Sequence, residues 1–181
     1  MAEVVHDYEF TDTVRFPLDV TWPIYRNEVP NLIHLLPNIE RIDVEKREEF
    51  DGGVNTVLWW HAKAKLPGPA AKLVSKDLFS WVDTATWRDP DHYVDYVLTM
   101  PELSDAVRVT GRNSFIADGT RTRIRLFGTI HTDMDKIKIV PKILLRSIVP
   151  TIQAFAVRLT KPNFDELNRG VEKYLDQKAR A

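Results

Sequence analysis

The chain has 181 residues, of which 44% are hydrophobic and 28% are charged, and its formal net charge is −1. This length fits one domain with a sizeable core, and the composition excludes a disordered chain. Nucleic-acid binding is excluded because the chain lacks a basic excess. There is no cysteine, which excludes disulfides and thiolate chemistry. We expect a single ligand-binding domain over residues 1–181.

No segment predicts export or membrane insertion. The first residues lack a basic leader and an apolar stretch, and no apolar run approaches the ~20 residues that span a bilayer. We therefore expect a cytoplasmic protein. Residues 132–161 carry six Lys and Arg against two Asp, a net charge of +4. Beside apolar residues, this charge favours transient contact with an anionic membrane surface, although a solvated helix face explains it equally well.

The N-terminal part predicts a strand and two short helices. Residues 4–10 alternate with period two, which indicates a strand. Its inward face includes His6, Tyr8 and Phe10. Residues 16–27 show helical spacing, which Pro23 should break into short pieces. The residues at this spacing are Leu18, Trp22 and Tyr25. Residues 31–36 predict the second short helix.

From residue 39 to residue 131 the period-two pattern returns. The segments 51–53, 89–91 and 118–119 have the Asp, Gly and Pro residues of tight turns. The expected strands cover residues 39–50, 54–66, 78–88, 92–100, 107–117 and 120–131. Each strand has an apolar face, which we expect to point inward.

The inward residues form the candidate wall of an internal space. They include Leu58, Trp60, Phe79, Trp81, Tyr96, Leu98, Asn113, Phe115, Ile124 and Leu126. Ordinary core packing explains each aromatic residue as well as a cavity wall does. Asn113 has three equal interpretations: it anchors a ligand's polar head, bonds a neighbouring strand, or faces solvent after a bulge. For His6, a hydrogen-bonded core histidine is favoured over a ligand contact.

After residue 132 the apolar period changes to three and four, which predicts an amphipathic helix. Pro150 and Pro162 should kink or split it. Its apolar residues include Leu144, Ile148, Ile152 and Phe155. A sheet with one apolar face must cover that face, and this helix is the element long enough to do so.

The last predicted hairpin is the part of the sequence that most clearly resembles a known protein family. Residues 109–124, VTGRNSFIADGTRTRI, form a strand, an Asp-Gly turn and a Thr-rich strand before the helix. Together with residues 16–22, FPLDVTW, they resemble the START-like, or helix-grip, superfamily (SRPBCC), which includes pollen-allergen-like, lipid-transfer and polyketide cyclase-like proteins. The resemblance covers nearly the whole chain. It implies an α+β helix-grip fold, a curved antiparallel β-sheet of about six or seven strands wrapped round a long C-terminal α-helix, with two short helices after the first strand.

The same resemblance implies a cavity between sheet and helix. An apolar cavity accepts apolar ligands, so we expect the chain to bind a hydrophobic small molecule, first of all a lipid, for carriage or transfer. We expect the entrance near Pro150 and the loop over residues 65–74. The apolar entrance residues are Leu66, Pro67, Leu73 and Val74. Flanking lysines suit a lid or interfacial docking, but a short helix at the sheet edge explains this loop slightly better.

No catalytic or metal-binding motif is present in the sequence. G-x-S-x-G, phosphate-binding loops and H-E-x-x-H are missing, and the five histidines lack metal-ligand spacing. We therefore expect neither a cofactor nor a metal, and we favour a non-catalytic protein. The first alternative is a polyketide cyclase/dehydratase-like enzyme that orients a bound chain by confinement. Its candidate residues are His6, Tyr8, Tyr96 and Asn113. The second alternative is a ligand-free interaction domain.

Overall fold

The computed structural model describes residues 3–63, 80–103, 106–133, 135–136, 161 and 163–180. The labelled elements are β1 (Val4–Val14), α1 (Leu18–Asn27), η1 (Val29–Leu35), β2 (Ile39–Phe50), β3 (Gly53–Ala62), β4 (Ser80–Arg88), β5 (Tyr93–Thr99), η4 (Pro101–Leu103), β6 (Val107–Asp118) and β7 (Arg121–Thr132). Both η elements are 3-10 helices. Residues 163–179 are helical, and we call them the C-terminal helix.

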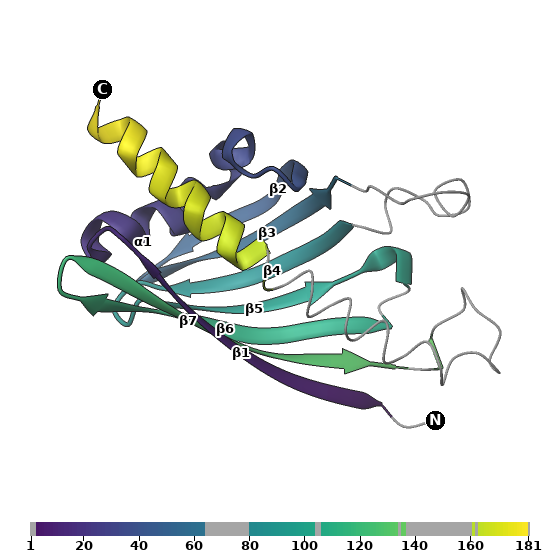
Figure 1. The fold of residues 1–181 in the computed structure, drawn as a ribbon. Coiled ribbons are helices and arrows are strands. Elements are labelled where there is room, and N and C mark those ends of the chain that lie inside the picture. The colour runs from purple at the N-terminus through teal and green to yellow at the C-terminus, as the bar shows by residue number, and fades with distance from the viewer. Residues whose placement is uncertain are drawn as a thin grey trace.

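The strands form one curved antiparallel sheet in the order β1-β7-β6-β5-β4-β3-β2 (Figure 1). Strands β2 to β7 follow each other as a meander, and β1 closes the other side by pairing with β7. The turns before β3 and β7 use Gly52 and Gly119 at positive φ, 80° and 63°, where residues with a Cβ are strained. The fold class expected from the sequence, α+β with a curved seven-stranded sheet, is confirmed.

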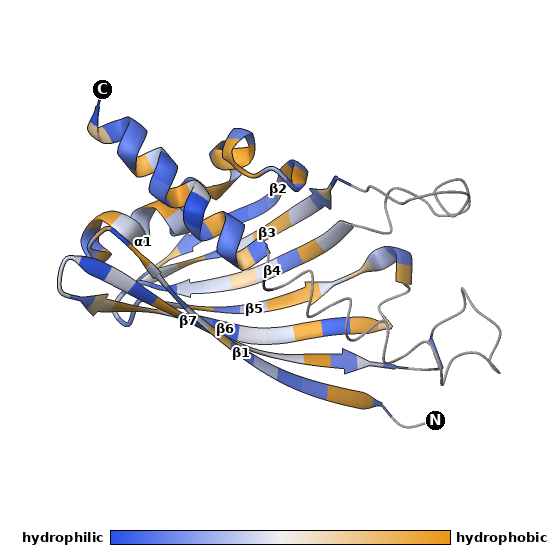
Figure 2. Cartoon of the chain, viewed as in Figure 1, coloured by the Kyte–Doolittle hydropathy of each residue, from blue (hydrophilic) through white to orange (hydrophobic). Residues whose placement is uncertain are grey.

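The C-terminal helix crosses the concave side of this sheet (Figure 1). Its buried residues Phe164, Val171 and Leu175 join the same apolar cluster as residues of α1 and of the sheet. Apolar and polar residues alternate along the strands, as Figure 2 shows by hydropathy. This alternation places one apolar face of the sheet against the helices.

Helix α1 corrects one expectation, since it runs through Pro23 without a break. A proline inside a helix removes one backbone donor. Here Pro23 is on the exposed side, while Trp22, Ile24 and Tyr25 are buried against the core. Packing of the apolar face therefore outweighs the lost hydrogen bond. The second short helix is present as η1, with the tighter 3-10 geometry.

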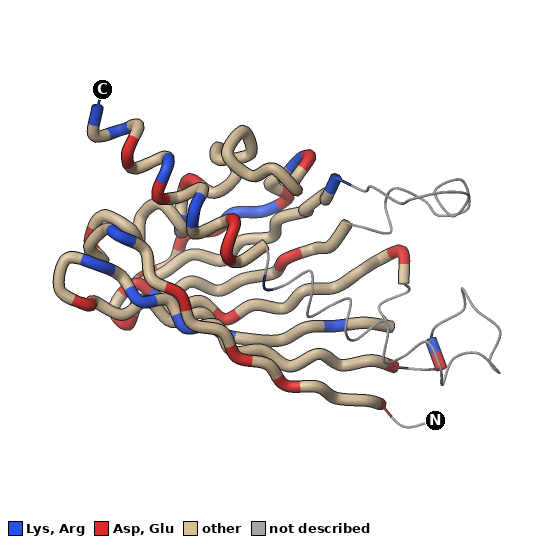
Figure 3. Tube along the Cα trace, in the orientation of Figure 1, with Lys and Arg blue, Asp and Glu red and all other residues tan. Residues whose placement is uncertain are grey.

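A buried polar network fastens the C-terminal helix to α1 and β1. The Tyr25 hydroxyl donates to Asn168 Oδ1 over 2.5 Å, and Asn168 Nδ2 donates to Asp12 Oδ2 over 2.8 Å. Arg169 Nη2 also donates to Asp12, and Arg169 Nη1 donates to Glu172. Figure 3 shows the charged residues along β1 and the helix that these pairs connect. Asn168 is completely buried, so its hydrogen bonds fix the helix in one position.

Burial and hydrogen bonding have opposite effects on the pKa of Asp12 in this network. Burial by itself raises the pKa of Asp12, but hydrogen bonds from Asn168, the Thr13 N–H and Arg169 outweigh it, and the net pKa is lowered. Burial, followed by the nearby Asp12 charge, raises the pKa of Tyr25. Asp12 therefore stays ionised, and Tyr25 stays a neutral donor, at physiological pH.

Among the described residues, no helix is both long and apolar enough to cross a membrane.

Asn168→Ala should destabilise the fold by about 1–3 kcal/mol, because it leaves buried polar atoms of Tyr25 and Asp12 without a partner. Urea unfolding followed by circular dichroism measures this loss. Asp165→Ala, which removes only an exposed pair with Lys161, should change stability by less than about 1 kcal/mol. Equal effects of the two substitutions would contradict the anchoring role of Asn168.

Candidate functional site

A cavity of about 210 Å³ lies between the concave face of the sheet and the start of the C-terminal helix. Strands β2 to β7 line it from one side, and Asn163, Phe164, Glu166 and Leu167 line it from the other. Tyr25 of α1 and Val29 of η1 also reach it. Most of its described lining is aliphatic or aromatic, so the cavity favours apolar contents.

The strand register arranges the lining in rows across the sheet. One row runs through Leu58, Asp83, Leu98 and Val109, which are direct cross-strand partners. The next row consists of Thr56, Ala85, Tyr96, Gly111, Gly128 and Tyr8. Four of these six residues are small, and two of the four are glycines.

Each tyrosine of this row lies over a glycine. A Cβ at Gly128 would come within 2.4 Å of the Tyr8 ring, and a Cβ at Gly111 would come within 2.4 Å of the Tyr96 hydroxyl. The hydroxyl oxygens of Tyr8 and Tyr96 are 3.3 Å apart, and Tyr96 also donates to the Phe127 carbonyl over 3.4 Å. Burial, together with Tyr8, raises the pKa of Tyr96, so this hydroxyl keeps its proton.

Asp83 is the unexpected member of the lining. It points inward from β4 between Trp81 and Ala85, and its Oδ1 atom is fully buried without a hydrogen-bond partner among the described residues. Burial raises the pKa of Asp83 to about 7. The residue as a whole is only partly buried, but its Oδ1 atom is fully buried. Asp83 is thus a group that changes charge near neutral pH in the middle of an apolar wall.

The sequence contained the signal for Asp83. Its position has the same parity as Trp81, Ala85 and Trp87, so period two places it on the inward face. Sequence reasoning identified that face by its apolar residues and passed over the one charged residue on it. Glu166 was also missed, because the start of the C-terminal helix could not be related to the sheet from sequence alone.

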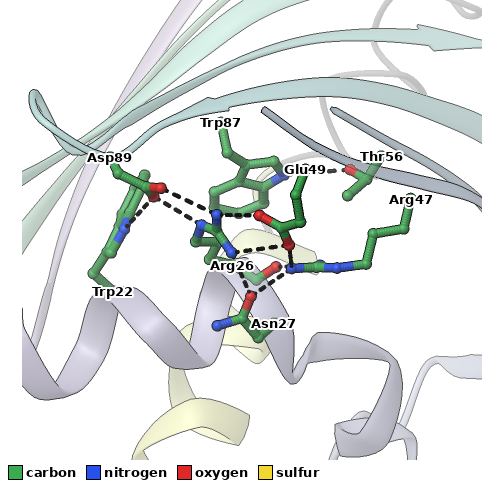
Figure 4. A network of polar contacts seen from close by, with 8 residues as sticks. All are labelled: Trp22, Arg26, Asn27, Arg47, Glu49, Thr56, Trp87 and Asp89. Carbon is green, nitrogen blue, oxygen red and sulfur yellow. Dashed lines mark hydrogen bonds and ion pairs between the residues drawn. The ribbon is translucent and has the colours of Figure 1, made fainter. Parts of the chain in front are cut away.

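A polar network holds one end of the wall in place (Figure 4). Arg26 of α1 donates to Asp89, in the turn after β4, over 2.7 Å, and to Glu49 of β2 over 2.7 Å. Trp22 also donates to Asp89, over 3.1 Å. Trp22 packs edge-on against Trp87 and Phe115, two residues of the lining. The network therefore holds Trp22 in place, and Trp22 in turn supports the lining residues Trp87 and Phe115.

No family model matches the chain, and no curated protein matches it. Solved structures match over nearly its whole length. The Zhui aromatase/cyclase from Streptomyces sp. R1128 is 17% identical, with a TM-score of 0.66 over 98% of both chains. Norcoclaurine synthase from Thalictrum flavum, in complex with dopamine and hydroxybenzaldehyde, is 16% identical, with a TM-score of 0.60 over 97% of this chain and 88% of its own. The chain has the helix-grip fold.

A protein from Thermus thermophilus shares this helix-grip fold, at 18% identity and a TM-score of 0.63 over 93% of this chain and 95% of its own. The resemblance drawn from residues 16–22 and 109–124 is therefore confirmed for the fold. At these identities the neighbours establish the fold alone, so the site must be argued from its own residues.

The helix-grip arrangement brings together ten of the residues expected at the cavity. The lining contains Tyr25, Leu58, Trp60, Trp81, Tyr96, Leu98, Asn113, Phe115, Ile124 and Leu126. Tyr8 and Trp22 are buried behind the lining, and Phe10 is half-buried beside Tyr8. His6 departs from the expectation, since it is exposed and does not line the cavity. It lies on the edge strand β1, where solvent reaches the inward face from the side.

The other expected site residues lie outside the described residues. They are Phe79, Leu144, Ile148, Ile152 and Phe155 of the wall, and Leu66, Pro67, Leu73 and Val74 of the entrance. Pro150 and most of the basic segment 132–161 lie there too. Among the residues that are described, no group of three or more His, Asp and Glu side chains has the arrangement of a metal site.

Gly128→Ala should destabilise the protein by about 1–3 kcal/mol, because the added Cβ overlaps the Tyr8 ring. In a Tyr8→Ala background the same substitution should cost at least about 1 kcal/mol less, since the overlapping ring is gone. Urea unfolding of the four proteins of this cycle measures the coupling. Additive effects would show that Tyr8 does not occupy the space above Gly128.

Asp83→Asn should change the pH dependence of stability. The folded protein holds the Asp83 proton more tightly than the unfolded chain, so the wild type loses stability as pH rises from about 4 to about 7. Relative to wild type, the variant should therefore gain on the order of 2 kcal/mol between pH 5 and pH 8. Urea unfolding at both pH values checks this. Asp95→Asn, which alters an exposed pair with Arg112, should show no such gain, and a similar gain there would contradict the assignment.

Proposed function

We propose that the chain binds a hydrophobic small molecule in the cavity between the sheet and the C-terminal helix. The observation that carries this proposal is the cavity itself, about 210 Å³ with a mostly apolar lining. Protein interiors are normally filled, and an unfilled apolar volume of this size costs on the order of several kcal/mol. A ligand that occupies the space offsets this cost.

A lipid is the ligand class that we propose first, and carriage or transfer is the corresponding role. Its support is the mostly aliphatic and aromatic lining, which includes Leu58, Leu98, Val109 and Ile124. Neighbours with the same fold add weaker support, since one was solved in complex with two small molecules. A filled interior would favour a ligand-free interaction domain, whereas the described residues line a cavity.

Native mass spectrometry of the purified protein, followed by organic extraction, tests this proposal. We expect a stoichiometric apolar compound to be bound, and an acyl chain in the extract would support the lipid assignment. An apo mass that also persists after incubation with a mixture of fatty alcohols, sterols and phospholipids would overturn the proposal.

Ala85→Phe should lower ligand occupancy by about tenfold, because its ring enters the cavity from the centre of β4. Thr84→Phe is the matched control: it adds a ring on the same strand, but at an exposed position on the other face. Ligand titrations of both variants give the occupancy, and circular dichroism verifies that each is folded. Equal occupancy in the two variants would exclude this cavity as the binding site.

One observation favours a second candidate function, a cyclase- or dehydratase-like enzyme. Tyr8 and Tyr96 lie within hydrogen-bond distance, and Tyr96 faces the cavity near the ionisable Asp83. Such a set of groups can move a proton on a confined substrate. The extracted compound distinguishes the two roles: recovery of an added ligand unchanged supports carriage, and a mass lowered by one water supports a dehydratase. Tyr96→Phe should stop that conversion without preventing binding.

A further inference from the structure

The carboxyl group of Asp83 faces the cavity without a donor from the described residues. Its Oδ1 atom is fully buried and makes no hydrogen bond to any of them. Its cross-strand partners on the two sides are Leu58 and Leu98, whose side chains offer no polar atom. A buried carboxylate without a donor is costly, so Asp83 either holds a proton or takes a donor from a water molecule or a ligand.

The rest of the lining adds negative charge and no positive charge. Glu166 reaches the cavity from the C-terminal helix, and its Oε2 atom is also buried without a partner among the described residues, while Oε1 accepts from Asn38. None of the described lining residues is Lys, Arg or His. A carboxylate ligand, such as an ionised fatty acid, would therefore meet two like charges and no counter-ion from this part of the wall.

Beside Asp83 the cavity presents two stacked indole rings. Trp60 and Trp81 are cross-strand partners whose ring centroids are 5.7 Å apart, with an angle of 12° between the planes. Trp81 and Asp83 are alternate residues on the same face of β4, so their side chains leave the strand roughly 7 Å apart. Aromatic faces attract cations, most strongly where water is excluded.

We propose that the ligand of this cavity carries a protonated amine on an apolar body, with the ammonium group bound by Asp83 beside Trp60 and Trp81. This inference rests on the proposed function, because it specifies the head group of the molecule that the cavity binds. The three parts are complementary: the ammonium supplies the donors that Asp83 lacks, the indoles stabilise its charge, and the aliphatic wall takes the apolar body. The raised pKa of Asp83 fits this assignment, since a bound cation would favour the ionised form.

Three probes with the same ten-carbon chain test the proposal: decylamine, decanol and decanoate. Each is titrated into the delipidated full-length protein at pH 8 by isothermal titration calorimetry, below the concentration at which the probe aggregates. Decylamine should bind about tenfold or more tightly than decanol, because it adds a charge-assisted hydrogen bond. Decanoate should bind more weakly than decanol, because its charge repels Asp83 and Glu166.

Variants assign the preference to Asp83. In Asp83→Asn, decylamine should lose about tenfold or more in affinity, while decanol should change by less than about threefold. Glu166→Gln should reduce the preference for the amine less, because one Glu166 oxygen already accepts a hydrogen bond from Asn38. Asp95→Asn removes an equal charge from the exposed face of β5 and should leave all three affinities unchanged. It therefore controls for the overall charge of the protein.

The outcomes separate this inference from the function on which it rests. If all three probes bind with similar affinity, or if decanoate binds best, the amine preference is wrong and the apolar binding function stands. If the preference persists in Asp83→Asn, the carboxylate has been assigned to the wrong residue. If none of the probes binds, the cavity is not a binding site and both proposals fall.

Discussion

Asn168 hydrogen-bonds on one side to Tyr25 of α1 and on the other to Asp12 of β1. The C-terminal helix thus meets β1 and α1, two consecutive elements from the other end of the chain, at this one buried amide. Because each polar atom must keep its partner inside the protein, the helix has little freedom to slide or rotate on the sheet. The position of Phe164, Glu166 and Leu167 over the cavity follows from that constraint.

The middle of the sheet contains a row of residues that are mostly small. Ala85 adds little bulk to the cavity wall, while the rings of Tyr8 and Tyr96 occupy the space over Gly128 and Gly111. Larger residues in this row would let sheet and helix pack as a solid core. Tyr96 brings a hydroxyl group to the wall itself, and the hydroxyl of Tyr8, behind the wall, lies 3.3 Å from it.

Periodicity in the sequence predicted most strands and many of their inward-facing residues. Contacts between residues far apart in the sequence determined the features that periodicity missed. Alternation along the strands identified inward residues such as Trp60 and Leu126, because the side chains of a strand must take opposite faces. Pro23 predicted a broken helix, which is wrong because local propensity ignores the burial of Trp22 and Tyr25 beside it. Asp83 was passed over although its parity was correct, because the inward face was identified by its apolar residues alone. No pattern in the sequence relates Asn168 to Asp12, which are 156 residues apart.

The sheet of this protein curves without closing, and so within the described residues it keeps two free edges, β1 and β2. An unpaired edge is a template on which another strand can add, and many proteins aggregate by that route. Strand β2 carries the exposed charges of Lys46, Glu48 and Glu49, and its pairing with β3 is shifted at two places. An incoming strand would have to desolvate these charges and follow an irregular backbone. The protein can therefore hold an open, ligand-sized interior without offering this edge of its sheet for extension.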